Sequence, residues 1–177
     1  MTPPQDGLSN PRDVKAQMSS GTFQADGETP APEMPRVTAT REMNMENFTT
    51  KVLGSTHDAM APDGSEVRLL PQMTRGGMAH FALGPRLVSK AVAHRTIEEI
   101  WYFICGRGRM WRRLGGSEGE GQVVDVYPGV SITIPTGTQF QFRNDGDEAL
   151  EAIGVTMPPW PGPDEAFQVK GIWEPTA

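Results

Sequence analysis

His94 and Glu99 lie five positions apart in the sequence, and both side chains can exchange protons or bind a metal ion. His94 ends one predicted strand, and Glu99 begins another in which Glu99, Trp101 and Phe103 alternate onto one face. An imidazole beside a carboxylate can act as a general acid and base, or it can bind a metal ion. We therefore predict that His94 and Glu99 are the catalytic or binding centre of the protein.

The rest of the chain must supply the elements that hold these two side chains. Short apolar or alternating runs, separated by Gly, Pro and Asp-Gly turns, indicate an all-β protein. Strands are predicted over residues 48–53, 66–73, 78–83, 87–94, 98–104, 107–113, 122–127, 131–134, 139–143 and 150–157. This regular spacing, without a long run of helical period, favours a β-sandwich or β-barrel.

Two short motifs make this expectation more specific. Four residues separate His94 from Glu99 and six separate Glu99 from Gly106, which resembles the second half of the first motif of the cupin family. The second cupin motif is matched by Gly129, Pro135, Gly137 and Asn144. The resemblance covers residues 65–158 and implies a jelly-roll barrel, or double-stranded β-helix, whose interior holds the site.

The chain is expected to have three parts. Residues 1–45 are rich in Pro, Ser, Thr and Gln with isolated apolar residues, and we expect a flexible tail or arm there. Residues 46–158 are expected to form the cupin barrel. Residues 159–177 contain Pro and Trp, and because aromatic rings are costly to leave in water we expect them to dock on the barrel or on a second subunit. The docked segment could be plain packing or a lid over the barrel mouth.

The inward side chains of such a barrel line a ligand pocket. Strand alternation places Val92 and His94 on the inner face with Glu99, and it points Gln139, Gln141 and Arg143 to a solvated outer surface. Of the nearby arginines, Arg109, which follows Gly108, is the one we expect to reach the pocket. The alternative is that it lies on the solvated face of the sheet. Ligand contacts are expected from Trp101, Phe103, Arg109, Thr138, Phe140 and Phe142.

The resemblance also implies a metal centre of three histidines and one carboxylate, suited to Fe, Mn, Ni or Zn. Here Val92 and Phe140 stand at two of the histidine positions, so only His94 and Glu99 remain. His80, which its strand could point inward, is a further candidate ligand. A divalent transition metal is one expectation, a metal-free acid–base pair is another, and a pair that only joins two strands is the third.

Composition limits the class of protein. The 177 residues carry a net charge of −6 with no basic run to neutralise phosphates, so no nucleic-acid partner is expected. No apolar run is long enough to span a bilayer or to form a signal-peptide core, so no membrane partner is expected either. The one cysteine, Cys105, forms no intrachain disulfide, and a cytoplasmic protein is the simplest expectation.

Together these features predict a cupin that binds a small polar or carbohydrate-like molecule and has a partly degraded metal site. Whether it is an enzyme stays open. One alternative is a metal-dependent dioxygenase, isomerase or epimerase that uses His94 and Glu99. Another is a non-catalytic sensing or scaffold module. Sheet edges need covering, and the resemblance implies a homodimer.

Overall fold

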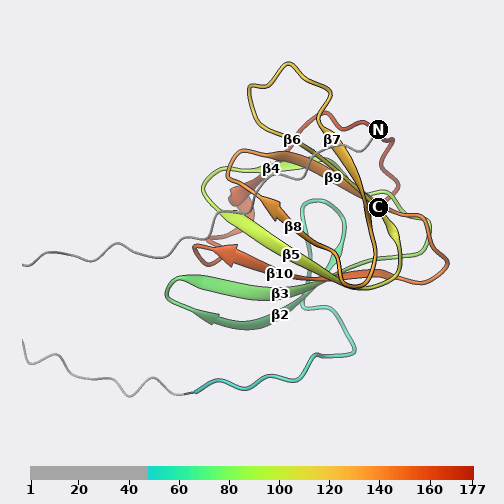
Figure 1. Cartoon of the computed structure of the whole chain (residues 1–177). Coiled ribbons are helices and arrows are strands. Elements are labelled where there is room, and N and C mark those ends of the chain that lie inside the picture. The colour runs from blue at the N-terminus through green and yellow to red at the C-terminus, as the bar shows by residue number, and fades with distance from the viewer. Residues whose placement is uncertain (1–47) are drawn as a thin grey trace, which may run out of the picture. The chain divides into compact units, whose positions relative to one another are not determined.

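The computed structural model describes residues 48–177 (Figure 1). The chain divides into the units Met1–Asn44 and Met45–Ala177, and the tail expected over residues 1–45 lies outside the described residues. None of the helices found in residues 48–177 is long and apolar enough to cross a membrane.

Two antiparallel β-sheets make up most of the described chain (Figure 1). The six-stranded sheet runs in the order β1 (Ala59–Met60), β2 (Glu66–Met73), β3 (Gly76–Leu83), β10 (Leu150–Met157), β5 (Glu98–Cys105) and β8 (Ser131–Ile134). The five-stranded sheet runs in the order β11 (Ala166–Gln168), β4 (Val92–His94), β9 (Gln139–Asn144), β6 (Gly108–Arg113) and β7 (Gln122–Val126). A turn of 3₁₀ helix, η1 (Pro163–Glu165), precedes β11.

The chain passes repeatedly between the sheets, and this confirms the predicted double-stranded β-helix. From β4 to β10 it enters the five-stranded sheet, then the six-stranded sheet, then returns through β6 and β7, crosses to β8, returns to β9 and ends in β10. His94 and Glu99 therefore belong to different sheets, and the short connection between β4 and β5 brings them to the same end of the barrel.

Alternation along β5 separates the inside of the barrel from the outside. Its inward residues are Glu99, Trp101 and Phe103, all buried, whereas the intervening outward residues are exposed. Trp101 stacks on Phe81 with ring centroids 4.7 Å apart and an interplanar angle of 12°. A Cβ at Gly154 would lie 2.6 Å from the Phe81 ring and 3.1 Å from the Trp101 Nε1 atom, so glycine permits this stack.

Two residues of the second sequence motif have structural explanations. Gly137 has a φ of 74°, which favours glycine, and its N–H donates to the His94 carbonyl over 3.1 Å. The Asn144 side-chain amide donates to the carbonyls of Leu83, Gly84 and Glu148 at 2.7–3.0 Å. The motif therefore fixes the backbone around the site, independently of any metal.

Two predicted strands are wrong as stated. Residues 48–53 are exposed and outside any strand, because no neighbouring strand pairs with them. The strand predicted over residues 87–94 is reduced to β4, although Val88 still forms an isolated bridge with Arg143. The short strands β1 and β11 were not predicted, since each is an edge strand too short to show an alternating pattern.

Ile172 and Trp173 of the C-terminal segment pack on the outer face of the five-stranded sheet, and this corrects the prediction for Gln141. Gln141 points away from the barrel interior as predicted, but it is buried and not solvated. Its amide donates to the carbonyls of Ser89 and Trp173 over 2.8 Å, and its oxygen accepts from the N–H groups of Ile172 and Trp173 over 3.0 Å. One glutamine thus holds the segment by three hydrogen bonds and joins it to the chain at Ser89 by a fourth.

Candidate functional site

The open end of the barrel encloses a cavity of about 500 Å³. Its walls come from both sheets, from the loop around β1 and from the C-terminal segment, and most of them are apolar. The polar side chains on the wall are Asp63, Gln72, His94, Glu99 and Thr156. The larger apolar side chains are Met60, Val67, Leu69, Leu70, Met78, Phe81, Val92, Trp101, Phe140 and Trp160. A volume of this size suits a small organic molecule.

His94 and Glu99 meet at this wall, as predicted. The His94 Nδ1 atom lies 3.8 Å from Glu99 Oε2, which is longer than a hydrogen bond, and both side chains are at least nine-tenths buried. Glu99 Oε2 accepts a hydrogen bond from the Trp101 indole N–H over 3.0 Å. His94 Nδ1 has no hydrogen-bond partner among the described residues. The imidazole therefore belongs to the cavity lining and has a buried polar atom without a partner among the described residues, which a ligand could satisfy.

Burial shifts the two groups in opposite directions and leaves both uncharged at neutral pH. Desolvation raises the pKa of Glu99 to about 8. The hydrogen bond from Trp101 opposes this rise, and the nearby Asp63 carboxyl adds to it by a smaller amount. Desolvation lowers the pKa of His94 to about 4, a change that the Glu165 carboxylate partly offsets. At pH 7 the carboxyl therefore holds a proton and the imidazole does not.

Asp63 is the second acid on the wall. It is buried in the loop after β1, where its Oδ1 atom accepts hydrogen bonds from the backbone N–H of Ser65 over 2.8 Å and from its hydroxyl over 2.7 Å. Burial raises the pKa of the Asp63 carboxyl, and the Ser65 hydrogen bonds and the charge of Lys90 oppose that rise. The sequence indicated only a turn at this position, because Pro-Asp-Gly is turn chemistry whether or not a cavity lies beside it.

Residues 160–168, called here the C-terminal strap, close one side of the cavity. β11 pairs with β4, with Ala166 opposite His94. The Glu165 carboxylate accepts hydrogen bonds from the backbone N–H groups of Thr96 and Ile97 at 2.6 and 2.9 Å, and from the Thr96 hydroxyl at 2.8 Å. Burial opposes its ionisation, but these bonds outweigh burial and hold the pKa of Glu165 below its usual value. The strap places the Trp160 ring 5.5 Å from the His94 ring.

The remaining predicted ligand contacts fall into two groups. Trp101 and Phe140 line the cavity. Phe103, Thr138 and Phe142 are buried on the inner faces but lie behind the lining residues, and Phe142 packs edge-on against Trp101 at 5.3 Å. These three therefore support the wall and do not form it.

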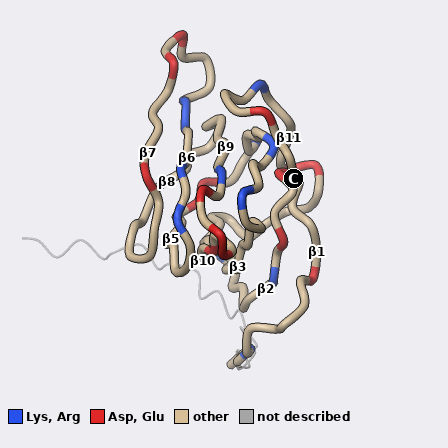
Figure 2. The backbone as a smooth tube through the Cα atoms, turned by 90° about the vertical axis from the view of Figure 1, so that its right-hand side faces the viewer, with Lys and Arg blue, Asp and Glu red and all other residues tan. Residues whose placement is uncertain are grey.

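Arg109 does not reach the cavity, which corrects that prediction. It lies on the outer face of β6 with its Nε atom 3.5 Å from both the Asp125 and Asp145 carboxylates. Figure 2 shows basic and acidic residues interspersed along this part of the chain. The sequence could not decide the point, because one residue of register moves a side chain to the opposite face of a sheet.

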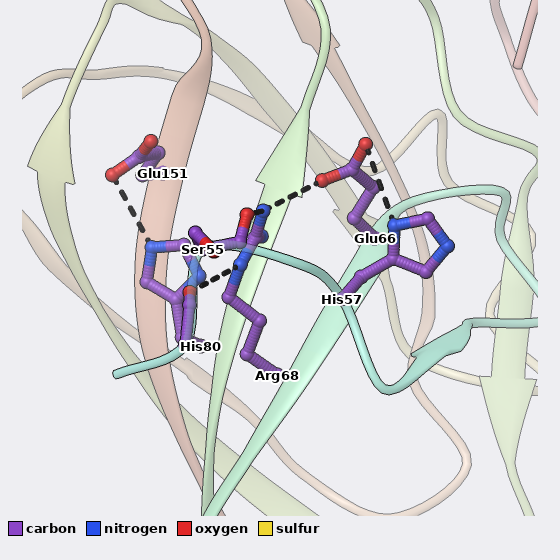
Figure 3. Close-up of polar contacts among 7 residues, drawn as sticks. Ser55, His57, Glu66, Arg68, His80 and Glu151 are labelled. Carbon is purple, nitrogen blue, oxygen red and sulfur yellow. Dashed lines mark hydrogen bonds and ion pairs between the residues drawn. The ribbon is translucent and has the colours of Figure 1, made fainter. Parts of the chain in front are cut away.

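His80 also faces away from the cavity, so the prediction that it supplies a metal ligand is wrong. It pairs in register with Arg68 and Ile153 on the outer face of the six-stranded sheet. Its Nε2 atom lies 3.2 Å from Glu151 Oε2 (Figure 3). Arg68 holds the chain around Gly54 and Ser55 close by through hydrogen bonds to their carbonyls, and Figure 3 shows this chain beside His80.

The donor set does not fit a resident transition metal. Val92 and Phe140, which stand where the resemblance implies histidines, are register partners and both are buried beside the site. Across residues 48–177, no three or more His, Cys, Asp or Glu side chains are grouped so that they could hold a metal ion. Two ligands 3.8 Å apart, one of them a protonated carboxyl, are a poor match for Fe, Mn, Ni or Zn.

Comparison with known proteins agrees with the fold. A family model described as a cupin domain matches residues 79–156. An uncharacterized protein of Methanocaldococcus jannaschii is 30% identical over 122 residues, which cover 64% of this chain and 92% of that protein.

Solved structures show the same architecture at low sequence identity. A conserved protein from Klebsiella pneumoniae, described as having a double-stranded β-helix domain, gives a TM-score of 0.53 at 13% identity and covers 70% of this chain and 100% of that one. An oxalate decarboxylase gives a TM-score of 0.51 at 17% identity and covers 59% of this chain and 28% of that one. Because the two motifs, the barrel topology and the family model agree, this chain belongs to the cupin superfamily.

Proposed function

We propose that this protein binds a small organic molecule inside the barrel and holds the polar end of that molecule at His94 and Glu99. The observation that carries the proposal is that His94 lines a cavity of about 500 Å³ and that its buried Nδ1 atom has no hydrogen-bond partner among the described residues. An unsatisfied buried polar atom costs about 1–3 kcal/mol, and a bound ligand would remove that cost.

The lining supports a ligand with an apolar body. A carbohydrate carries hydroxyl groups on every side, and each of them needs a partner when it leaves water. This wall offers five polar side chains, and Asp63 already has one carboxylate oxygen engaged by Ser65. The structure therefore favours a hydrocarbon or aromatic body with one polar end over the carbohydrate-like ligand that the sequence suggested.

A thermal-shift screen with a cavity-filling variant tests the proposal. Ligand at one hundred times its Kd should add about 2.7 kcal/mol to the free energy of unfolding. Ala166→Trp fills the cavity from the strap and should abolish the shift, while Phe167→Trp, on the same strand but outside the lining, should keep it. If apolar, aromatic and polar compounds all leave the melting temperature unchanged, the protein is a scaffold and the proposal fails.

The opposed pKa shifts favour acid–base turnover as a second candidate function. A protonated Glu99 can donate a proton and a neutral Nδ1 atom of His94 can accept one, so the pair could move a proton between two positions of a bound carbonyl or hydroxyl compound. Incubation of bound ligands in D₂O, with deuterium uptake at carbon followed by NMR, tests this activity. Uptake that is lost in both His94→Gln and Glu99→Gln supports an isomerase or epimerase, and no uptake leaves a binding protein.

A further inference from the structure

The polar side chains that line the cavity are acidic or uncharged at neutral pH, and none among the described residues is basic apart from the His94 imidazole. Two acids, Asp63 and Glu99, lie on the wall, and no Lys or Arg is among the described residues that line it. Resting on the function proposed above, we propose that the ligand is an organic amine with an apolar body, bound as the ammonium ion, and that the cavity rejects carboxylates and phosphates.

Hydrogen-bonding capacity gives the first argument. An ammonium group carries three donors and no acceptor. Glu99 as a carboxylate is an acceptor, and so is the Nδ1 atom of a neutral His94 whose proton sits on Nε2. The two atoms lie 3.8 Å apart, close enough for one nitrogen to contact both. The Nδ1 atom has no partner among the described residues, although the ring is buried. An N–H group of a bound ammonium ion would satisfy it, and Glu99 would release the proton that it otherwise holds to solvent when the cation binds.

The second argument is the electrostatic field of the wall. Asp63 lies near enough to Glu99 to oppose its ionisation, and the Glu165 carboxylate acts on His94. Carboxyl groups therefore approach the pair from the β1 loop and from the strap, and that of Glu165 has a lowered pKa. A cation reduces this repulsion, whereas a carboxylate ligand would lose its hydration beside two acids with no counter-ion on the wall.

Two cations near the site, Lys90 and Arg95, are absent from the cavity lining, although the charge of Lys90 acts on the Asp63 carboxyl. Arg95 is the basic residue next to His94, but its Nε atom donates to the Asp164 carbonyl over 3.0 Å and its guanidinium stacks 4.7 Å from the Phe167 ring centroid. It is exposed on the far side of the strap and does not line the cavity. No basic group among the lining residues is thus available to an anion.

Aromatic rings around His94 supply the third argument. The rings of Phe140 and Trp160 approach the imidazole edge-on, with centroids at 5.2 and 5.5 Å, and both residues line the cavity. Rings near a desolvated ammonium group attract it through their negative faces, with Trp the strongest of the aromatic side chains. A carboxylate receives no such attraction.

A matched ligand series tests the proposal. Naphthylmethylamine, naphthalenemethanol and naphthoate share one apolar body and differ in the charge of the polar end. Isothermal titration at pH 7 should show the amine binding at least about ten-fold more tightly than the alcohol, a difference of about 1.4 kcal/mol, and no binding of naphthoate. Glu99→Gln should remove most of the preference for the amine while the alcohol still binds.

Controls separate this inference from the function on which it rests. Glu98→Gln changes the adjacent, exposed glutamate and should leave all three affinities unchanged. If Glu99→Gln does not fold, Asp63→Asn should weaken the amine selectively. Equal binding of amine and alcohol, or tighter binding of naphthoate, overturns the amine proposal but keeps the binding function. Failure of all three compounds, with no shift in the wider screen, counts against the binding function itself.

Discussion

The protein contains two buried histidines, each near a glutamate, and the two pairs differ in their access to water. Inside the barrel, His94 and Glu99 have side chains only 6% and 2% exposed, and their nearest polar atoms are 3.8 Å apart. On the outer face of the six-stranded sheet, His80 is 2% exposed, but Glu151 is 32% exposed and lies within hydrogen-bond distance at 3.2 Å (Figure 3).

The difference shows what a ligand site requires. In the outer pair the protein supplies one hydrogen bond and water reaches the carboxylate, although the buried His80 Nδ1 atom, like His94 Nδ1, has no hydrogen-bond partner among the described residues. His80 and Glu151 do not line the cavity, so a ligand there could not reach them. The inner pair has neither water nor a mutual hydrogen bond, and it faces an open volume. The same two residue types are therefore structural in one place and a candidate site in the other.

The largest expected effect comes from removing the indole that supports the inner pair. Trp101 stacks on Phe81, packs against Phe142 and donates to Glu99. Trp101→Ala should lower the free energy of unfolding by about 3–5 kcal/mol, because it leaves a large cavity. Trp101→Phe keeps most of the ring packing but removes the donor, and it should cost about 1 kcal/mol.

Urea denaturation followed by circular dichroism measures both changes. Tyr102→Phe, on the exposed face of the same strand, is the matched control and should change stability by less than about 0.5 kcal/mol. If Trp101→Ala were no more damaging than this control, the aromatic wall would not be what holds the inner pair in place.

The pH dependence of stability should show the inner pair directly. The pKa of Glu99 is about 8 in the folded protein against an ordinary 4.5, so its stabilising contribution is complete below pH 4.5 and is lost as the pH rises to 8. The pKa of His94 is about 4 against 6.5, so its contribution is present above pH 6.5 and is lost as the pH falls to 4. Between pH 6.5 and 8 only the loss from Glu99 operates.

Over that interval the Glu99 contribution should fall by about 2 kcal/mol, at about 1.4 kcal/mol for each pH unit. Glu99→Gln cannot ionise and keeps an oxygen to accept from Trp101, so its stability relative to wild type should rise by that amount. Chemical denaturation of both proteins at pH 6.5, 7.25 and 8 measures the difference. If the difference in unfolding free energy between the two proteins stayed constant over these pH values, Glu99 would be solvated by water.

The smallest effect is expected at the outer pair. Glu151→Gln leaves an amide oxygen that can still accept from His80, and the carboxylate it replaces is already partly solvated. The change in unfolding free energy should be below about 1 kcal/mol. A loss as large as that of Trp101→Phe would show that the two pairs are energetically alike.

Much of the inner site could be predicted from alternation. The inward positions of Glu99, Trp101 and Phe103 follow from the period of a strand. The position of His94 follows from the short connection that leads from it to β5. The fold class follows from the many short strands and from two motifs. These features are set by residues that are close in the sequence, so they can be predicted from the sequence alone.

The predictions that were wrong or missing concern contacts between segments that are distant in the sequence. His80 has the alternation of an inward residue only if the register of β3 is chosen wrongly, and nothing local fixes that register. Gln141 was predicted to be solvated because the residues that bury it come thirty positions later. Asp63 and Trp160 reach the cavity from a turn and from a proline-rich segment, whose paths depend on what they pack against.

The strap anchored by Glu165 has a consequence for the kinetics of exchange. Trp160, Pro163 and Ala166 form one wall of the cavity, and three hydrogen bonds to a single carboxylate hold that wall closed. A bound molecule that leaves on this side must wait for those bonds to break together. Its residence time would then be governed by the opening rate of the polypeptide, and compounds of quite different affinity could depart at similar speeds.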